Sequence, residues 1–102
     1  MWVFVMFDLP VKSKPQRKAA AGFRKQLLED GFWMLQFSVY ARPCPTQENA
    51  KVHYDRVRSW LPSEGQVRML QFTDKQFARM ELFNRAKRGR LEEAPGQLQL
   101  FR

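Results

Sequence analysis

The hydrophobic pattern begins with an uninterrupted run of β-branched and aromatic residues at positions 2–7, which Asp8, Leu9 and Pro10 bring to an end. A continuous apolar run of this kind, followed by a turn signal, is typical of a central strand that is buried on both faces. The pattern therefore predicts a buried first strand, and it places Asp8 at the C-terminal end of that strand.

A helical spacing follows the first strand. Pro15 suits the first turn of a helix, with Ser13 or Lys14 before it, and Gly31 is a natural stop. These signals predict a helix that runs to about Asp30. Apolar residues recur within it at three- and four-residue spacing, which defines the core-facing stripe of an amphipathic helix. The stripe consists of Ala20, Phe23 and Leu27.

The middle of the chain predicts one or two strands and then a second helix. Polar and apolar residues alternate across positions 32–42, over a length that favours two strands or one bent strand. A break at positions 43–45 follows, Thr46 is a suitable N-cap, and Pro62 and Gly65 end the helix. The predicted apolar face of this helix consists of Ala50, His53, Tyr54, Val57, Trp60 and Leu61.

Positions 67–73 are typical of another strand. Asp74 is predicted to cap one helical turn that reaches Phe77, and a short strand is predicted at positions 80–83. The resulting β-α-β-β-α-β order is the ferredoxin-like pattern of the α+β class, in which an antiparallel sheet carries both helices on one face. The other face of such a sheet needs a cover.

The C-terminal part divides into a polar, arginine-rich linker at 85–96 and an alternating segment at 97–102, after a domain at 1–84. The alternation is typical of a half-buried edge strand. A strand on a flexible linker can pair with its own sheet or with the open edge of another chain, and we favour exchange onto a partner. The predicted partner-binding residues are Gln97, Leu98, Gln99, Leu100 and Phe101.

The charge of the chain limits the classes of ligand that the protein is expected to bind. Lys and Arg number 18 against 10 Asp and Glu, which gives a formal net charge of +8. Such an excess indicates a polyanionic ligand, and nucleic acid is the favoured one. Six cations lie between Asp8 and Glu29 with no acidic residue among them, and their alternative role is a solvated helix face. The predicted nucleic-acid-binding residues are Lys12, Lys14, Arg17, Lys18, Arg24 and Lys25.

Other features exclude several classes of protein. The single cysteine, Cys44, excludes an intrachain disulfide and a multi-cysteine zinc site, which fits a reducing cytoplasm. The opening apolar run is too short to span a bilayer, so no membrane association is expected. Cys44 lacks a positioned base and His53 lacks a second ligand, so neither is a catalytic candidate. The tryptophans Trp2, Trp33 and Trp60 are expected to pack in the core rather than stack bases.

Several segments together resemble a known family. They are Met6-Phe7-Asp8-Leu9-Pro10, Arg17-Lys18, Phe23-Arg24-Lys25, Leu27-Leu28, Gly31-Phe32 and Met34-Leu35-Gln36-Phe37-Ser38-Val39-Tyr40. With the strand at 67–73, the Asp74-Lys75-Gln76 turn and the leucine-rich end, they cover nearly the whole chain. The chain resembles the Cas-two family of CRISPR-associated spacer-acquisition proteins, in its type II form.

The resemblance implies a homodimer of ferredoxin-like domains whose sheets face each other and whose C-terminal strands are exchanged, which would supply the missing cover. Members of this family bridge two dimers of the Cas-one integrase, and the assembly holds a short double-stranded DNA for insertion into a CRISPR array. Other type II CRISPR components are further partners that the resemblance implies. Some members are metal-dependent nucleases, but for this chain we favour the architectural role and leave enzymatic activity open.

Asp8 is the acidic residue that the resemblance marks. Its two copies would approach each other across the dimer axis, where Mg²⁺ could activate a water for phosphodiester cleavage or neutralise the facing charges. The residues alone favour a simpler role, in which Asp8 caps or braces the turn before Pro10. The resemblance instead makes Asp8 the predicted metal ligand. Asp8 is also the predicted catalytic residue of the alternative function, a Mg²⁺-dependent endoribonuclease or DNase.

A further alternative is an RNA-recognition module on the same topology. Such a module would display aromatic side chains on an open sheet to stack single-stranded bases. A sheet face that is buried in a dimer would make those aromatic rings unavailable, so strict dimerisation and a preference for duplex DNA would contradict this alternative.

Overall fold

The computed structural model describes residues 1–84, so the predicted linker at 85–96 and the strand at 97–102 lie outside the described residues. The elements are, in chain order, β1 (Trp2–Asp8), α1 (Lys14–Glu29), β2 (Trp33–Gln36), β3 (Val39–Pro43), α2 (Gln47–Ser59), β4 (Gln66–Phe72) and α3 (Asp74–Ala78). The first six follow the predicted order. None of the described helices is long and apolar enough to cross a membrane.

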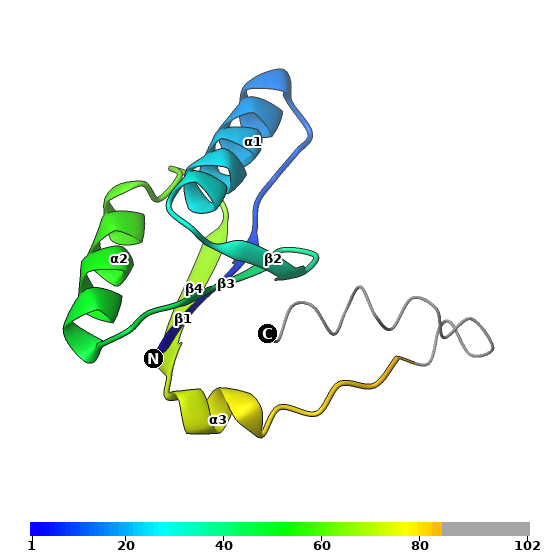
Figure 1. Cartoon of the computed structure of the whole chain (residues 1–102). Coiled ribbons are helices and arrows are strands. Elements are labelled where there is room, and N and C mark those ends of the chain that lie inside the picture. Colours follow the sequence, from blue (N-terminus) through cyan, green and yellow to red (C-terminus); the bar gives the residue numbers. More distant parts are fainter. Residues whose placement is uncertain (85–102) are drawn as a thin grey trace.

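The four strands form one sheet in the order β2-β3-β1-β4, and each neighbouring pair is antiparallel. β1 is an inner strand, as its continuous apolar sequence predicted. α1 and α2 lie over one face of the sheet, whereas α3 lies beyond the end of β4, near the N-terminus (Figure 1). The ferredoxin-like α+β fold is confirmed.

Alternate residues of β1 serve two hydrophobic cores, one on each face of the sheet. Val3 and Val5 belong to the larger core, in which Phe23 and Leu27 of α1 pack with buried residues of α2. Phe4 belongs to the smaller core on the opposite face, where α3 contributes Phe77. The Phe77 ring stacks on Trp2 at a centroid distance of 3.8 Å. α3 therefore covers one end of the face that α1 and α2 leave open.

The two long helices begin at side-chain caps. Ser13, rather than Lys14, caps α1: its hydroxyl accepts from the Gln16 N–H at 3.2 Å, and the Gln16 side chain accepts from the Ser13 N–H at 2.9 Å. Thr46 caps α2, as predicted, and accepts from the Asn49 N–H at 3.0 Å. These bonds satisfy backbone donors that have no partner within the helix.

Two predictions near the end of the described chain are wrong. Asp74 does not cap α3, because Thr73 has extended backbone and forms the capping box with Gln76, so Asp74 falls in the first turn. Residues 80–83 form no strand and pair with none of the described strands. Without a neighbouring strand to satisfy the backbone, an extended conformation gains nothing, and Phe83 is 72% exposed.

The structure also settles one open point and corrects one prediction in the middle of the chain. Residues 32–42 form two strands rather than one bent strand, because Phe37 and Ser38 make a tight turn in which Ser38 has a φ of 63°. Leu61 was wrongly placed on the apolar face of the second helix: α2 ends at Ser59, Trp60 is its C-cap, and Leu61 is 45% exposed.

Candidate nucleic-acid interface and the Asp8 site

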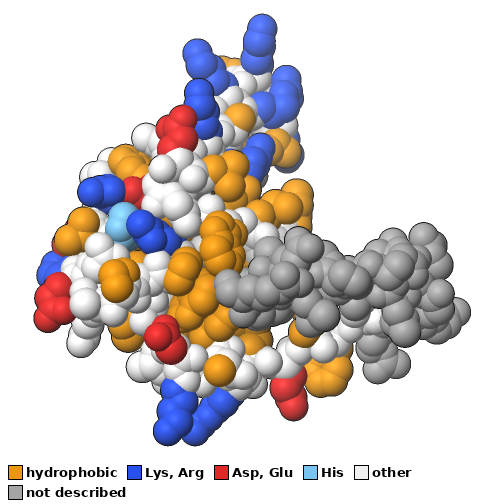
Figure 2. All heavy atoms as spheres, in the orientation of Figure 1, with side chains coloured by type: hydrophobic (Ala, Val, Ile, Leu, Met, Phe, Trp, Pro, Cys, Tyr) orange, Lys and Arg blue, Asp and Glu red, His pale blue; other side chains and the backbone are white. Residues whose placement is uncertain are grey.

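The six cations predicted to bind nucleic acid lie on α1 and on the loop that leads into it. Lys and Arg side chains gather at the end of the molecule that α1 forms (Figure 2). Five of the six side chains are exposed and one is half-buried. None forms an ion pair with another residue of the described range, so acidic side chains there do not neutralise them. We call this set the α1 basic cluster: Lys12, Lys14, Arg17, Lys18, Arg24 and Lys25.

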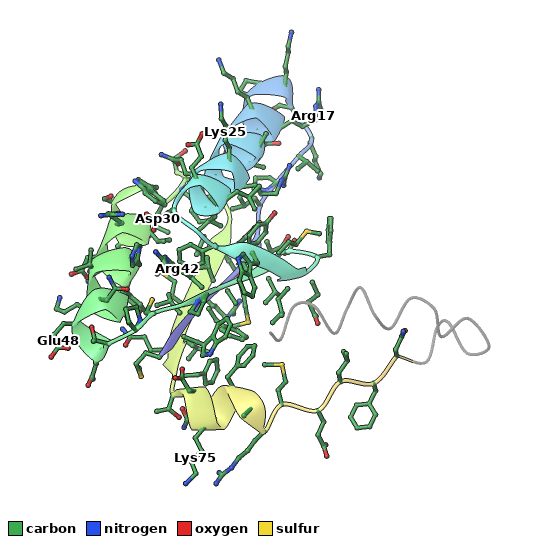
Figure 3. The ribbon with its side chains drawn as sticks, in the orientation of Figure 1. Arg17, Lys25, Asp30, Arg42, Glu48 and Lys75 are labelled. Carbon is green, nitrogen blue, oxygen red and sulfur yellow. The ribbon has the colours of Figure 1, made fainter. Side chains whose placement is uncertain are left out.

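Arg17 has a structural contact that sequence reasoning missed. One of its guanidinium nitrogens donates to the Val11 carbonyl at 3.2 Å and to the Lys12 carbonyl at 2.9 Å. Arg17 therefore fixes the loop between β1 and α1, which carries Lys12 and leads into α1 at Lys14. Its other N–H donors are left for a ligand, and both Arg17 and Lys25 extend from α1 (Figure 3).

Three chain segments meet where β1 ends at Asp8. The Phe7 N–H donates to the Ser38 carbonyl at 3.0 Å, which places the β2–β3 turn beside this end of the strand. On the other side, Asp8 is paired with Gln66 of β4. Gly65 has a φ of 94°, and a Cβ there would lie 2.7 Å from the Asp8 carbonyl oxygen. Glycine at position 65 is therefore required for β4 to begin so close to Asp8.

The Asp8 side chain is exposed, and its carboxylate makes no hydrogen bond or ion pair with any residue in the described part of the chain. The alternative in which this carboxylate braces the turn before Pro10 is therefore not supported. Arg17 makes the bonds that hold the following loop instead. Both oxygens of Asp8 are left to bind a ligand from solution.

One carboxylate offers only part of a metal site. Mg²⁺ commonly binds one or two carboxylates and completes its octahedral shell with water and substrate phosphate. Within residues 1–84, no group of three or more His, Cys, Asp or Glu side chains could hold a metal ion. The unpaired carboxylate of Asp8 fits a weakly held Mg²⁺ that keeps most of its waters, so metal binding at Asp8 stays a prediction.

A second polar cluster, between α1 and α2, was missed by sequence reasoning. Asp30, the C-cap of α1, has one carboxylate oxygen 2.7 Å from His53 Nδ1 and the other 2.6 Å from a guanidinium nitrogen of Arg56. The Asp30 and His53 side chains are 8% and 7% exposed, and Asp30 lies at the end of α1 that is next to α2 (Figure 3). His53 is therefore a buried, hydrogen-bonded residue on the apolar face of the second helix, where the spacing predicted it.

The remaining candidates, Cys44 and the tryptophans, contribute to the packing of the fold. Burial raises the pKa of the Cys44 thiol, which keeps it protonated near neutral pH, and the thiolate is the nucleophilic form. This supports the prediction that Cys44 is not catalytic. The tryptophans pack as predicted: Trp33 meets Trp2 edge to face at 6.0 Å, and Trp60 packs against the larger core.

Together these features define a small, basic α+β protein with a ferredoxin-like sheet, unpaired cations around one helix and a free carboxylate at the end of its first strand. The model of one protein family, described as CRISPR associated protein Cas2, matches residues 1–80. The chain therefore belongs to the CRISPR-associated Cas2 family, which confirms the resemblance that its motifs indicated.

Two relatives and one solved structure agree with this assignment. The chain is 52% identical to the CRISPR-associated endoribonuclease Cas2 of Parvibaculum lavamentivorans over 101 residues, which cover 99% of this chain and 100% of the relative. It is 48% identical to the protein of the same name from Flavobacterium psychrophilum, with coverage of 99% and 88%. The crystal structure of Streptococcus pyogenes Cas2 at pH 6.5 covers 82% of this chain and 100% of its own, with a TM-score of 0.61 at 19% identity, which supports the fold.

Proposed function

We propose that this chain is a homodimeric, cytoplasmic DNA-binding subunit of CRISPR spacer acquisition, which bridges dimers of the Cas-one integrase around a short duplex. The observation that carries the proposal is the α1 basic cluster, six cations without an acidic partner among the described residues. Contacts from Lys and Arg to phosphate bind DNA without sequence preference, which suits a protein that must accept spacers of any sequence.

Fluorescence anisotropy with short duplexes of unrelated sequence, over a series of salt concentrations, tests the DNA contact. Replacing Lys14, Lys18 and Lys25 together by alanine should weaken binding of every duplex and lower the salt slope by about one for each lost phosphate contact. Lys51→Ala is the matched control, because Lys51 is an exposed lysine of α2 that already pairs with Asp55 at 2.7 Å. Equal binding by the triple variant and this control would contradict the proposal.

The sheet face opposite α1 and α2 supports the homodimer. Near α3 this face is apolar, and on the same face Leu70 of β4 is 45% exposed. The apolar part of this face needs another layer to cover it, and we propose that a second copy provides that layer. The smaller core on this face includes Trp2, Phe4, Leu35, Val39, Ala41, Phe72 and Phe77.

We also propose that the C-terminal segment, residues 97–102, is exchanged between the two copies. Light scattering of the full chain, and of a chain truncated before Gln97, should be measured with and without the Cas-one integrase. We expect a dimer that recruits the integrase only when residues 97–101 are present. A monomer that is indifferent to the truncation would overturn the dimeric bridge.

A Mg²⁺-dependent endoribonuclease is the second candidate function. The free Asp8 carboxylate favours it, and the two relatives described above carry the name endoribonuclease. A Mg²⁺ ion held by the two copies of Asp8 would supply an activated water for phosphodiester cleavage. Asp8→Asn should then abolish Mg²⁺-dependent cleavage of RNA, while Asp55→Asn on α2 should not affect it. Cleavage that is unchanged in Asp8→Asn would exclude this function.

The RNA-recognition alternative has less support. The rings of Trp2 and Phe4 already pack against Phe77 and Phe72, so they do not form an open platform for bases. In the anisotropy assay, a monomer that binds single-stranded RNA more tightly than duplex DNA would restore this alternative.

A further inference from the structure

The open sheet face has a polar half as well as an apolar half. Phe4 and Phe72 contact each other on this face, with ring centroids 4.8 Å apart. Because alternate residues of a strand share a face, Asp8 of β1 and both Gln66 and Arg68 of β4 belong to it too. In the register Asp8 lies opposite Gln66, and Arg68 is two residues further along β4. A carboxylate, an amide and a guanidinium thus lie on one face of two neighbouring strands, and we call them the Asp8–Gln66–Arg68 group.

Arg68 is hydrogen-bonded within this group, but no acidic side chain of the group neutralises it. Its guanidinium donates to Gln66 Oε1 at 3.3 Å, and the side chain is exposed. Diagonal neighbours across an antiparallel pair lie about 7–8 Å apart, so Asp8 is close to Arg68. Nevertheless, these two side chains form no ion pair. A guanidinium carries five N–H donors in a planar fork, so several of those of Arg68 are open to a ligand.

We propose that Arg68, oriented by Gln66, binds a nonbridging phosphate oxygen of a nucleic-acid backbone beside Asp8. The inference rests on the proposed nucleic-acid function and adds a contact on the sheet face, separate from the α1 basic cluster. The planar fork of a guanidinium matches the geometry of phosphate oxygens, which accept two parallel hydrogen bonds. Gln66 limits the rotamers of Arg68, so less side-chain entropy is lost when the phosphate binds.

The neighbouring carboxylate gives this site a distinctive dependence on divalent cations. Without such a cation, Asp8 repels the phosphate that Arg68 attracts. With Mg²⁺ bound at Asp8, the repulsion is replaced by attraction, because Mg²⁺ is commonly shared between a carboxylate and a substrate phosphate. Removal of Asp8 and removal of Arg68 should therefore have opposite effects on phosphate binding in EDTA.

The test uses the full chain and the dinucleotide TpT, which contains a single phosphodiester. Titration is followed through the arginine Nε–H signals in NMR spectra, where the Arg68 signal should shift more than that of Arg58, an exposed arginine of α2. Arg68→Ala should weaken TpT binding about tenfold, the effect expected for a charge-assisted hydrogen bond. Arg68→Lys should retain part of the affinity because it keeps the charge without the fork, and Arg58→Ala should change nothing.

The variants at Asp8 and at the lysines complete the test. In EDTA, Asp8→Asn should tighten TpT binding, and it should abolish the gain that Mg²⁺ gives the unmodified chain. The variant that lacks Lys14, Lys18 and Lys25 should still shift the Arg68 signal with TpT. Failure of duplex binding and failure of the Arg68 contact therefore give different patterns.

Two results would overturn the inference. One is equal TpT affinity in Arg68→Ala and Arg58→Ala. The other is an Arg68→Ala variant that binds TpT normally but dissociates to a monomer at a higher concentration than the unmodified chain in light scattering. That result would assign the guanidinium of Arg68 to an acidic group of a second copy instead of a phosphate.

Discussion

Two aspartates of this molecule each lie near an arginine and a third polar side chain, yet only one of them is paired. Asp30, between α1 and α2, is 8% exposed and uses both carboxylate oxygens, on His53 and on Arg56. Asp8, on the open sheet face, is exposed and has no partner among residues 1–84 although Arg68 is a diagonal neighbour. The same types of residue therefore serve stability in one place and remain open to a ligand in the other.

Exposure to solvent explains why Asp30 is paired and Asp8 is not. A buried carboxylate that lacks partners is costly, so a fold that places Asp30 between two helices must also supply donors for it. An exposed carboxylate is stabilised by water, so nothing forces Asp8 and Arg68 to pair. The unpaired charges on this surface are therefore available to a ligand, whereas the paired charge of Asp30 stabilises the contact between α1 and α2.

The largest expected effect separates these two aspartates. Asp30→Ala leaves the buried imidazole of His53 without its partner and removes the contact to Arg56, so the free energy of unfolding should fall by about 3 kcal/mol. Asp8→Ala should change it by less than about 0.5 kcal/mol, as surface substitutions usually do. Urea denaturation of both variants measures the difference. Equal losses of stability would show that Asp8 has a structural partner after all.

The next effect concerns the backbone beside Asp8. Gly65→Ala adds a Cβ at a φ of 94° and 2.7 Å from the Asp8 carbonyl oxygen, and it should cost about 2 kcal/mol by thermal or urea unfolding. Gly22 is the matched control: it lies in α1 with nothing within 4 Å of an added Cβ. Gly22→Ala should stabilise the chain by about 0.5–1 kcal/mol. A harmless Gly65→Ala would mean that β4 does not begin as described.

A smaller effect distinguishes the two arginines. Arg56 is 53% exposed, so its ion pair with Asp30 is partly screened and Arg56→Ala should cost about 1 kcal/mol. Arg68→Ala should cost less than about 0.5 kcal/mol, because Arg68 has only a neutral amide partner. Both values come from the same denaturant series. A greater loss for Arg68→Ala would identify Arg68 as structural.

The smallest effect is a dependence of stability on alkaline pH. Because burial raises the pKa of the Cys44 thiol, the folded chain keeps this proton to a higher pH than the unfolded chain does. The free energy of unfolding should therefore fall as pH rises above the unfolded thiol pKa of about 8.5, until the folded pKa is passed. In Cys44→Ala this part of the slope should disappear from urea denaturation curves. An unchanged slope would assign it to other groups.

Local patterns of apolar residues predicted the fold well. The continuous run that became β1 and the three-residue stripe of α1 both depend on neighbours in sequence, which is why their positions could be predicted. The errors arose where two local signals compete or where a partner is required. Thr73 and Asp74 are both good capping residues, and backbone geometry decides in favour of Thr73. Residues 80–83 have strand-like composition but no described strand beside them.

The candidate site was only partly predictable, because some of its contacts join segments that are distant in sequence. Asp8 and the cations of α1 stand out because they follow or surround clear elements. The link between Asp30 and His53 spans 23 positions and follows no periodicity, so no sequence pattern indicates it. The alternation of β4 could place Gln66 and Arg68 on one face, but only the register with β1 brings them next to Asp8.

That register has a consequence for the order in which the protein acquires its parts during synthesis. β1 is the first strand of the described sheet to leave the ribosome and β4 is the last, and their pairing is the most distant in sequence. Pairing between remote segments forms late in folding, because a long loop must close before any contact rewards it. A nascent or truncated chain without β4 would therefore carry the carboxylate of Asp8 but not the guanidinium of Arg68. Binding at this place would then be restricted to chains whose sheet is complete.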